Sequence, residues 1–236
     1  MSLFAGLVER LADLLQPFFH ASAAAAAIVL FTALVRLLVH PLSRAAARGQ
    51  QARARLQPRI AELKKKHAKD PEKFQKAVLA LHAEEKVSPL SGLLPALLQL
   101  PAFFLLYHLF SSTRIGGEGN HLLAHALFAA PLGDRWADAL GHGGPLGPAG
   151  LVYLGLFALV AGVAAFNYRR TKRTMAESPV QAGDGEQVPG LGAVTKAMPF
   201  LSFFTLVTVA VVPLAAALYV VTSTTWSAVE RAVLHR

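Results

Sequence analysis

The chain has 236 residues, of which 54% are apolar and only 16% are charged, whereas a soluble domain carries about 25% charged residues. The mean hydropathy of +0.44 therefore favours a membrane protein over a soluble one. The sequence contains no cysteine, which excludes disulfides, thiolate metal sites, a cysteine nucleophile and a lipid-anchoring cysteine.

The net charge of +9 is concentrated in one segment. Residues 44–86 contain twelve Lys and Arg against five Asp and Glu, and the rest of the chain contributes only +2. A basic block between apolar runs indicates membrane topology before it indicates a nucleic-acid site. We therefore expect a cytoplasmic segment and no specific nucleic-acid partner.

Residues 1–18 predict an amphipathic helix that lies along the extracytoplasmic membrane interface. Leucines recur at steps of three or four between Leu3 and Leu14, with polar residues largely between them. A cleaved signal peptide is the alternative. Glu9 and Asp13 count against it, because the segment ahead of the apolar run of a signal peptide is normally basic.

Residues 19–43 form the first predicted transmembrane span. The run is long enough to cross the hydrocarbon, which takes roughly 20 apolar residues. Arg36 interrupts it, six residues before Leu42, or about 9 Å along a helix.

Residues 44–87 predict a cytoplasmic hairpin of two helices. Asp70 suits the N-cap of the second helix and Pro71 its first position. Apolar residues at helical spacing on both arms should pack together and leave the basic residues outward. The hairpin residues that we single out for function are Arg59, Lys64, Lys65, Asp70 and Pro71.

The remainder of the chain predicts four further spans. Two apolar stretches meet at Pro213, and one continuous helix would be too long for a bilayer, so a hairpin of two spans is favoured. The expected elements are a span at 88–111, an extracytoplasmic loop at 112–148, a span at 149–168, a cytoplasmic loop at 169–195, spans at 196–212 and 213–230, and a short cytoplasmic tail at 231–236.

Together these segments predict an all-α polytopic membrane protein with five transmembrane helices, an N-terminal interfacial helix and a cytoplasmic helical hairpin. Orientation follows from the basic residues. The segment 44–86 and the cluster 169–173 fall on one side, whereas acids balance the bases in 112–148. The N-terminus should lie outside and the C-terminus inside.

Arg36 is the strongest functional candidate. An arginine at the centre of a span costs about 2.5–3.5 kcal/mol and normally faces protein or water, although a snorkelling arginine is the alternative. The nearest acid to any apolar stretch is Glu230, at the end of the last span. We therefore expect a hydrated cavity, or a site for a partner's negative charge. Polar residues that could line such a cavity, although each hydroxyl can also bond its own helix, are Gln99, Ser202, Thr205, Thr208 and residues 222–225.

The sequence indicates neither a catalytic nor a metal site. His121 and His125 stand four residues apart, a spacing that can chelate zinc on a helix, but no HExxH pattern or nearby carboxylate accompanies them. We expect a structural or solvated pair. There is no Walker motif, no GxSxG and no embedded aspartate pair, so we expect no enzyme activity and no cofactor.

Four segments carry a family resemblance. Residues 32–42 read TALVRLLVHPL, with a single arginine followed by Pro-Leu, residues 57–58 are Gln-Pro and residues 69–73 read KDPEK. Residues 87–101 read VSPLSGLLPALLQLP. In these segments the chain resembles the YidC/Oxa/Alb membrane protein insertases, in the short bacterial form without a large extracytoplasmic domain. Residues 213–226 match the final span of that family more loosely.

The resemblance implies a five-helix insertase of the bacterial cytoplasmic membrane, with a hydrophilic groove open to cytoplasm and lipid. Nascent membrane proteins and the bilayer are the implied partners, and the Sec translocon, the ribosome and the targeting receptor are further candidates. The apolar segments of the substrate would pass from the groove into lipid. The resemblance assigns the substrate-receiving arginine to Arg36, and the residues that we expect to line the groove with it are Gln99, Ser202, Thr205, Thr208, Ser223 and Trp226.

The sequence also departs from the family. Its usual Leu-Tyr-Trp is Leu218-Tyr219-Val220, and its Ser-Asn is Ser223-Thr224. No extended basic tail follows the last span, so docking of a ribosome through a tail is not expected. Two other functions fit the residues alone: a small-anion transporter that uses Arg36, although no internal repeat is found, or a scaffold whose basic hairpin binds anionic lipid.

Overall fold

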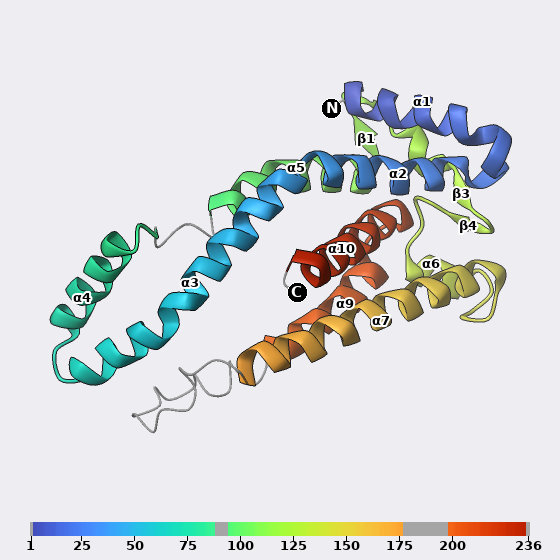
Figure 1. Ribbon diagram of the computed structural model, residues 1–236. Helices are drawn as coiled ribbons and strands as arrows, with labels where there is room; N and C mark the ends of the chain where they lie inside the picture. The colour runs from blue at the N-terminus through green and yellow to red at the C-terminus, as the bar shows by residue number, and fades with distance from the viewer. Residues whose placement is uncertain (1, 88–93, 177–197, 235–236) are drawn as a thin grey trace. The chain divides into compact units, whose positions relative to one another are not determined.

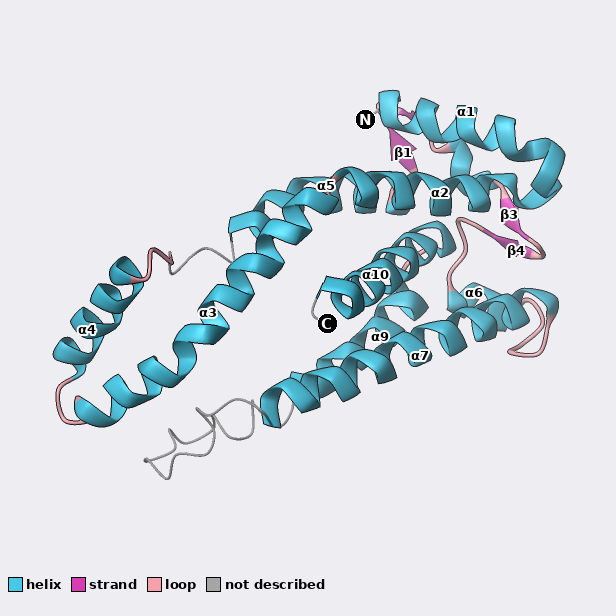
Figure 2. Cartoon of the chain, in the orientation of Figure 1, coloured by secondary structure: helices cyan, strands magenta, loops and turns pink. Residues whose placement is uncertain are grey.

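The computed structural model describes residues 2–87, 94–176 and 198–234, which are mostly helical (Figures 1 and 2). The chain divides into two compact units. Residues 1–38, 101–168 and 200–233 form the first, which we call the main unit. Residues 39–100, 169–199 and 234–236 form the second.

The main unit begins with two helices that pack side by side, α1 (Ser2–Phe19) and α2 (Ala23–Leu38) (Figure 1). A short 3-10 turn, η1 (His20–Ser22), joins them, and His20 has a positive φ of 47° where the chain reverses. Val8 and Ala12 of α1 are buried in the core that the alanine-rich α2 also lines. A second apolar row on α1 stays exposed and comprises Leu3, Leu7, Leu14 and Phe18.

The predicted helix at the N-terminus is confirmed, but its apolar side has two uses. One row contacts α2, because the small side chains of the alanines at 23–27 let the two helices approach closely. Three of the leucines that the spacing had identified, Leu3, Leu7 and Leu14, are in the exposed row, whereas Leu11 packs partly against the core. Its location at the membrane interface stays a prediction.

The remaining helices of the main unit supply most of the core. They are α5 (Leu94–Ser111) and α7 (Pro148–Ala176), each of which extends into the second unit, then η4 (Met198–Phe203), α9 (Phe204–Val211) and α10 (Leu214–Leu234). Residues 212–221 are buried without interruption, so the first half of α10 lies at the centre of this core.

The segment between α5 and α7 is folded, whereas the sequence predicted a loop. Two antiparallel hairpins form there, and the first turns at Gly116 and Gly117, whose positive φ values of 63° and 93° suit a two-residue turn. We call residues 112–148 the outer cap. Its elements are β1 (Arg114–Ile115), β2 (Glu118–Gly119), η2 (His121–Ala124), β3 (Ala126–Leu127), β4 (Ala130–Pro131) and α6 (Trp136–Gly141).

Hydrogen bonds fasten the outer cap to three helices. The side chain of Asn120 donates to the carbonyls of Leu109 and Ser112 at the end of α5, at 2.8 and 3.0 Å. The carbonyls of Leu132 and Asp134 accept from the first two N–H groups of α10 at 2.9 and 2.8 Å. The Tyr153 hydroxyl of α7 donates to the Asp134 carbonyl at 2.6 Å. The bonds to Leu109 and to the first N–H groups of α10 satisfy helix-end groups that would otherwise lack partners.

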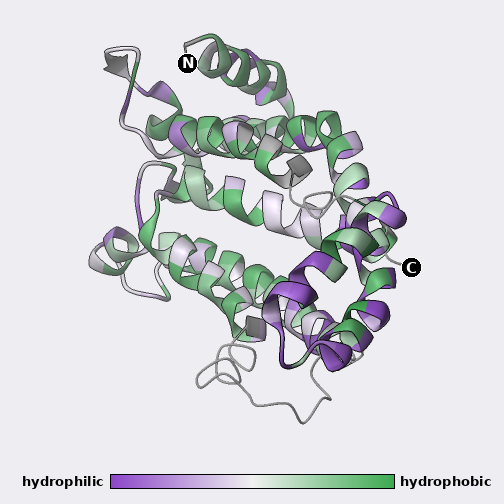
Figure 3. Cartoon of the chain, turned by 90° about the vertical axis from the view of Figure 1, so that its left-hand side faces the viewer, coloured by the Kyte–Doolittle hydropathy of each residue, from purple (hydrophilic) through white to green (hydrophobic). Residues whose placement is uncertain are grey.

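The second unit contains the helical hairpin, α3 (His40–Lys66) and α4 (Pro71–Glu84). Leu56 and Leu81 are buried where the arms meet. The basic side chains of both arms remain largely exposed, and hydrophilic residues alternate with hydrophobic ones along the two helices in Figure 3. The predicted antiparallel hairpin with its break at Asp70 and Pro71 is therefore confirmed.

Some helix bounds differ from those predicted. Within the span expected at 19–43, α2 covers only Ala23–Leu38, and a new helix, α3, begins at His40, where Pro41 is tolerated in the first turn. The span expected at 196–212 is divided between η4 and α9, with residues 196–197 outside the described part. The break at Pro213 is confirmed: α9 ends at Val211, and Val212 is extended.

Length and apolar composition allow two helical stretches of the described residues to cross a membrane, Leu3–Leu38 and Pro148–Arg173. The first of these includes the reversal at η1, so it is not one straight span. Pro199–Val211 is apolar but shorter.

Candidate functional site

Arg36 and Ser223 form the central polar contact of the main unit. Arg36 lies two residues before the end of α2, and its Nε donates to the Ser223 hydroxyl at 2.9 Å. Its Nη2 donates to the Ser223 backbone carbonyl at 3.0 Å. These two bonds connect α2 to α10 across 187 residues of sequence.

Both acceptors on Ser223 are neutral, so the contact orients the guanidinium without neutralising its charge. Nε and Nη2 form the side-on edge of the guanidinium, which can also bind the two oxygens of a carboxylate. Ser223 thus presents two oxygens to the edge that an acidic side chain would otherwise occupy. Ser223 itself is buried, and Arg36 is partly buried.

The wall next to this contact is aromatic. Tyr219 lies one turn before Ser223 on α10, and its ring centroid is 5.9 Å from that of Phe103 and 6.0 Å from that of Phe110 on α5. The same helix also carries the acidic residue Glu230. Glu230 stands two helical turns beyond Ser223, or about 10 Å along α10.

The other predicted groove residues have different surroundings. Thr208 donates back to the Phe204 carbonyl of its own helix at 3.3 Å. Ser202 on η4, and Thr205 and Trp226, are partly exposed. The side chain of Gln99 lies outside the described part of the chain. Among the described groove candidates, the structure therefore joins Ser223 to Arg36.

The hydroxyl-bearing residues within 222–225 differ in their hydrogen-bond partners. Thr224 returns its hydrogen bond to its own helix, to the Val220 carbonyl at 2.8 Å and the Val221 carbonyl at 3.0 Å. The Thr225 hydroxyl is buried and has no hydrogen-bond partner among the described residues. Thr224 thus bonds its own helix as expected, whereas the hydroxyl oxygen of Ser223 accepts a bond from another helix.

The hairpin residues form a local network in the second unit. The Asp70 carboxylate accepts a hydrogen bond from the Lys73 N–H at 3.0 Å and pairs with its ammonium, also at 3.0 Å. These contacts lower the pKa of Asp70. Pro71 opens α4, Arg59 pairs with Glu85 across the two arms, and the remaining singled-out residues, Lys64 and Lys65, are exposed.

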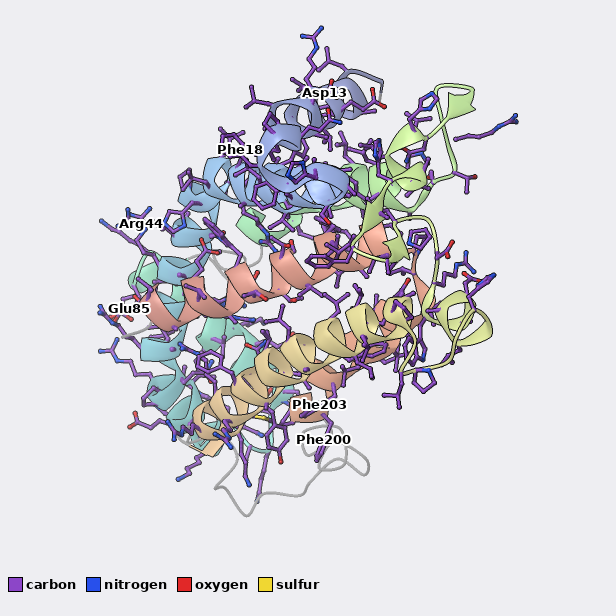
Figure 4. The ribbon with its side chains drawn as sticks, turned by 90° about the vertical axis from the view of Figure 1, so that its right-hand side faces the viewer. Asp13, Phe18, Arg44, Glu85, Phe200 and Phe203 are labelled. Carbon is purple, nitrogen blue, oxygen red and sulfur yellow. The ribbon has the colours of Figure 1, made fainter. Side chains whose placement is uncertain are left out.

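An aromatic cluster that the sequence analysis did not identify joins α7 to η4. The ring of Tyr168 lies 5.1 Å from that of Phe200 and 6.0 Å from that of Phe203. Figure 4 labels both phenylalanines at this end of the main unit. Their three-residue spacing on an apolar segment is the signal that could have indicated it.

His121 and His125 do not share an α-helix as their spacing suggested. η2 ends at Ala124, and His125 is extended. Both histidines line a cavity of about 500 Å³ between η2 and α1, together with Glu9, Asp13 and His20. No group of three or more His, Asp or Glu within the described residues has the geometry to hold a metal ion.

Comparisons with known proteins bear on the whole chain. The model of the 60Kd inner membrane protein family matches residues 14–236. A membrane protein insertase YidC of Clostridium perfringens is 40% identical over 111 residues, which cover 47% of this chain and 43% of the relative.

Proteins of the same name from two other bacteria are similar over 81 residues. The one from Magnetococcus marinus is 46% identical over 34% of this chain and 15% of its own length. The one from Stenotrophomonas maltophilia is 43% identical over 34% of this chain and 14% of its own length. The matched part thus spans less than half the length of these curated relatives.

The family match includes α2 with Arg36, the helical hairpin and α10 with Ser223, so the features built above from single residues lie inside it. The chain belongs to the 60Kd inner membrane protein family, that is, to the YidC/Oxa/Alb family which its sequence resembles.

Proposed function

We propose that this chain is a membrane protein insertase of the bacterial cytoplasmic membrane. It receives nascent membrane proteins at Arg36 and releases their apolar segments into the bilayer, alone or with the Sec translocon. The observation that carries the proposal is the Arg36–Ser223 contact, a guanidinium held between apolar helices by neutral acceptors. Such an arrangement keeps a full positive charge available to a passing polar segment.

The energetics favour a substrate with an acidic outer segment. A carboxylate at the centre of a bilayer costs about 2.5–3.5 kcal/mol. A hydrogen bond to a charged group contributes about 1.5–3 kcal/mol, so contact with Arg36 offsets much of that cost. The following apolar segment then enters lipid, driven by about 25 cal/mol per Å² of apolar surface removed from water.

In this proposal the chain crosses the membrane five times, with its N-terminus outside and its C-terminus inside. The two long apolar stretches and the shorter one at Pro199–Val211 support the count in part. The residues Gln99, Ser202, Thr205, Thr208 and Trp226 line a hydrophilic groove with Arg36 and Ser223. The basic hairpin, with Arg59, Lys64 and Lys65, faces the cytoplasm, where ribosome, targeting receptor and anionic lipid are its candidate partners.

The test is complementation in a bacterium depleted of its own insertase. The host expresses this chain or Arg36→Ala, and insertion of a short reporter with an acidic outer tail is measured by protease accessibility. We expect the wild-type chain to restore insertion. Arg36→Ala should lower the initial rate about tenfold or more, because it removes a charged hydrogen bond worth about 1.5–3 kcal/mol.

Arg44→Ala is the matched control. It removes the same charge from an exposed position on α3 and should leave insertion near the wild-type rate. A wild-type chain that reaches the membrane and does not restore insertion would overturn the proposed function. Equal rates for Arg36→Ala and Arg44→Ala would remove Arg36 from the mechanism.

A further inference from the structure

The side chain of Arg36 can place its guanidinium in either of two positions. It lies two residues before the end of α2, so its long side chain can reach the polar boundary beyond that helix, as arginines near helix ends commonly do. In the structure it turns instead toward α10, where Ser223 accepts both of its bonds. A local interaction must therefore favour the position beside α10 over the position past the end of α2.

Ser223 supplies that preference through two oxygens at suitable spacing. Its hydroxyl and its carbonyl bind the Nε and Nη2 groups at 2.9 and 3.0 Å. Ser223 is buried on α10, two residues beyond the uninterrupted core stretch 212–221, so these oxygens are fixed in place. A fixed pair of acceptors holds a guanidinium more firmly than a single flexible one.

The guanidinium has five N–H donors in a planar fork. The two bonds to Ser223 use its side-on edge. Of the other three donors, one on Nη1 and one on Nη2 form the end-on edge. A carboxylate can bind that edge with both oxygens at once. Holding the first edge therefore fixes the direction in which the second one points.

We propose that Ser223 is a positioning residue, which holds the Arg36 guanidinium toward α10 and directs its end-on edge at the carboxylates of incoming substrate segments. This inference rests on the proposed insertase function and adds to it the residue that orients Arg36 toward segments with Asp or Glu. Ser223 acts through Arg36 and makes no direct contact with substrate. Its effect is therefore expressed only with acidic substrates and only while Arg36 is present.

A double-mutant cycle with two reporters tests the proposal. The reporters differ only in an outer tail that carries Asp or Asn, and the variants are Ser223→Ala, Arg36→Ala and the pair. Ser223→Ala should lower the ratio of Asp-tail to Asn-tail insertion about tenfold, the effect of about 1.4 kcal/mol, which lies near the range for a charged hydrogen bond. In the Arg36→Ala background the same change should alter the ratio less than twofold.

Thr224→Ala is the matched control, because this neighbouring hydroxyl bonds its own helix. It should leave the ratio unchanged. Ser223→Cys keeps the side-chain volume and replaces the hydroxyl with a weak acceptor. It should reproduce Ser223→Ala, which guards against an effect of lost packing.

Two results would overturn this inference and leave the proposed function intact. The first is that Ser223→Ala lowers insertion of both reporters equally. The second is that the double variant lowers the Asp-tail to Asn-tail ratio by the product of the two single effects, because the two residues would then act independently. Either would assign Ser223 a merely structural role. A wild-type chain that inserts neither reporter would instead overturn the proposed insertase function, and this inference with it.

Discussion

At the scale of single residues, identical chemical groups in α10 have different partners. Ser223 binds Arg36, Thr224 bonds its own helix, and Thr225 is buried with no partner among the described residues. Each position is rotated by about 100° from the one before it, so neighbouring hydroxyls face different environments. Which hydroxyl meets Arg36 depends on how α10 is rotated against α2.

Gly150 is a position where one added methyl group should disturb the structure. It lies in the first turn of α7, and a Cβ there would approach the backbone oxygens of Gly144 and Pro145 to 2.4 and 2.5 Å. Backbone atoms cannot move aside cheaply, so we expect Gly150→Ala to destabilise the protein by about 1–3 kcal/mol. Denaturant titration in mixed micelles measures the change.

Gly155 offers the matched control on the same helix. A Cβ at this position meets nothing within 4 Å. Gly155→Ala should raise stability by about 0.5–1 kcal/mol, since alanine loses less backbone entropy in a helix. A Gly150→Ala protein as stable as Gly155→Ala would contradict the close approach seen in the structure.

At the scale of elements, the start of α4 is a pH-sensitive capping site. The Asp70 carboxylate accepts the Lys73 N–H, and its pKa is lowered by that bond and by the Lys73 ammonium. A lowered pKa in the folded state means that the carboxylate stabilises the fold above its unfolded pKa, and that this contribution is lost as the pH falls through the folded pKa.

We therefore expect hydrogen exchange at the Lys73 amide, corrected for its intrinsic pH dependence, to lose protection below the usual range of aspartate titration. Asp70→Ala should show low protection at every pH. Asp70→Asn keeps a capping oxygen without a titrating group, so its protection should not depend on pH there. A pH dependence retained in Asp70→Asn would assign the effect to another group.

Local chemistry made the hairpin readable from sequence, because Asp70 and Pro71 break and restart a helix without help from distant residues. The break at Pro213 is readable for the same reason. The start of α3 at His40 was missed, since Pro41 is as compatible with a first helical turn as with an interhelical link. The Arg36–Ser223 pair depends on packing between distant helices, so spacing along the chain could identify both residues but not their contact.

At the scale of the molecule, the outer cap holds the ends of α5, α7 and α10 together within the main unit. Its sequence is rich in Gly, Pro and His, which indicated only a loop. The hydrogen bonds that organise it go mostly to backbone carbonyls, which every residue type has, so the sequence does not indicate them. Side chains donate three of these bonds: the buried Asn120 makes two and Tyr153 makes one.

Asn120→Ala should loosen this cap. The change leaves the carbonyls of Leu109 and Ser112 without their donor, and we expect a loss of about 1–3 kcal/mol in stability. The loss should appear in denaturant titration and as faster proteolysis within residues 112–148. His121→Ala, at the exposed neighbouring position, should have little effect on either measurement. Equal effects of the two changes would contradict a structural role for Asn120.

The separation of Arg36 from Ser223 along the chain means that the two residues are synthesised at different times. The serine follows the arginine by 187 residues, and a ribosome adds about 5–20 residues per second. Roughly 9–37 s therefore pass between the synthesis of the charge and the synthesis of the group that holds it. Throughout that interval Arg36 must remain hydrated or bind elsewhere, so the new chain itself presents the kind of polar segment that is difficult to insert into a membrane.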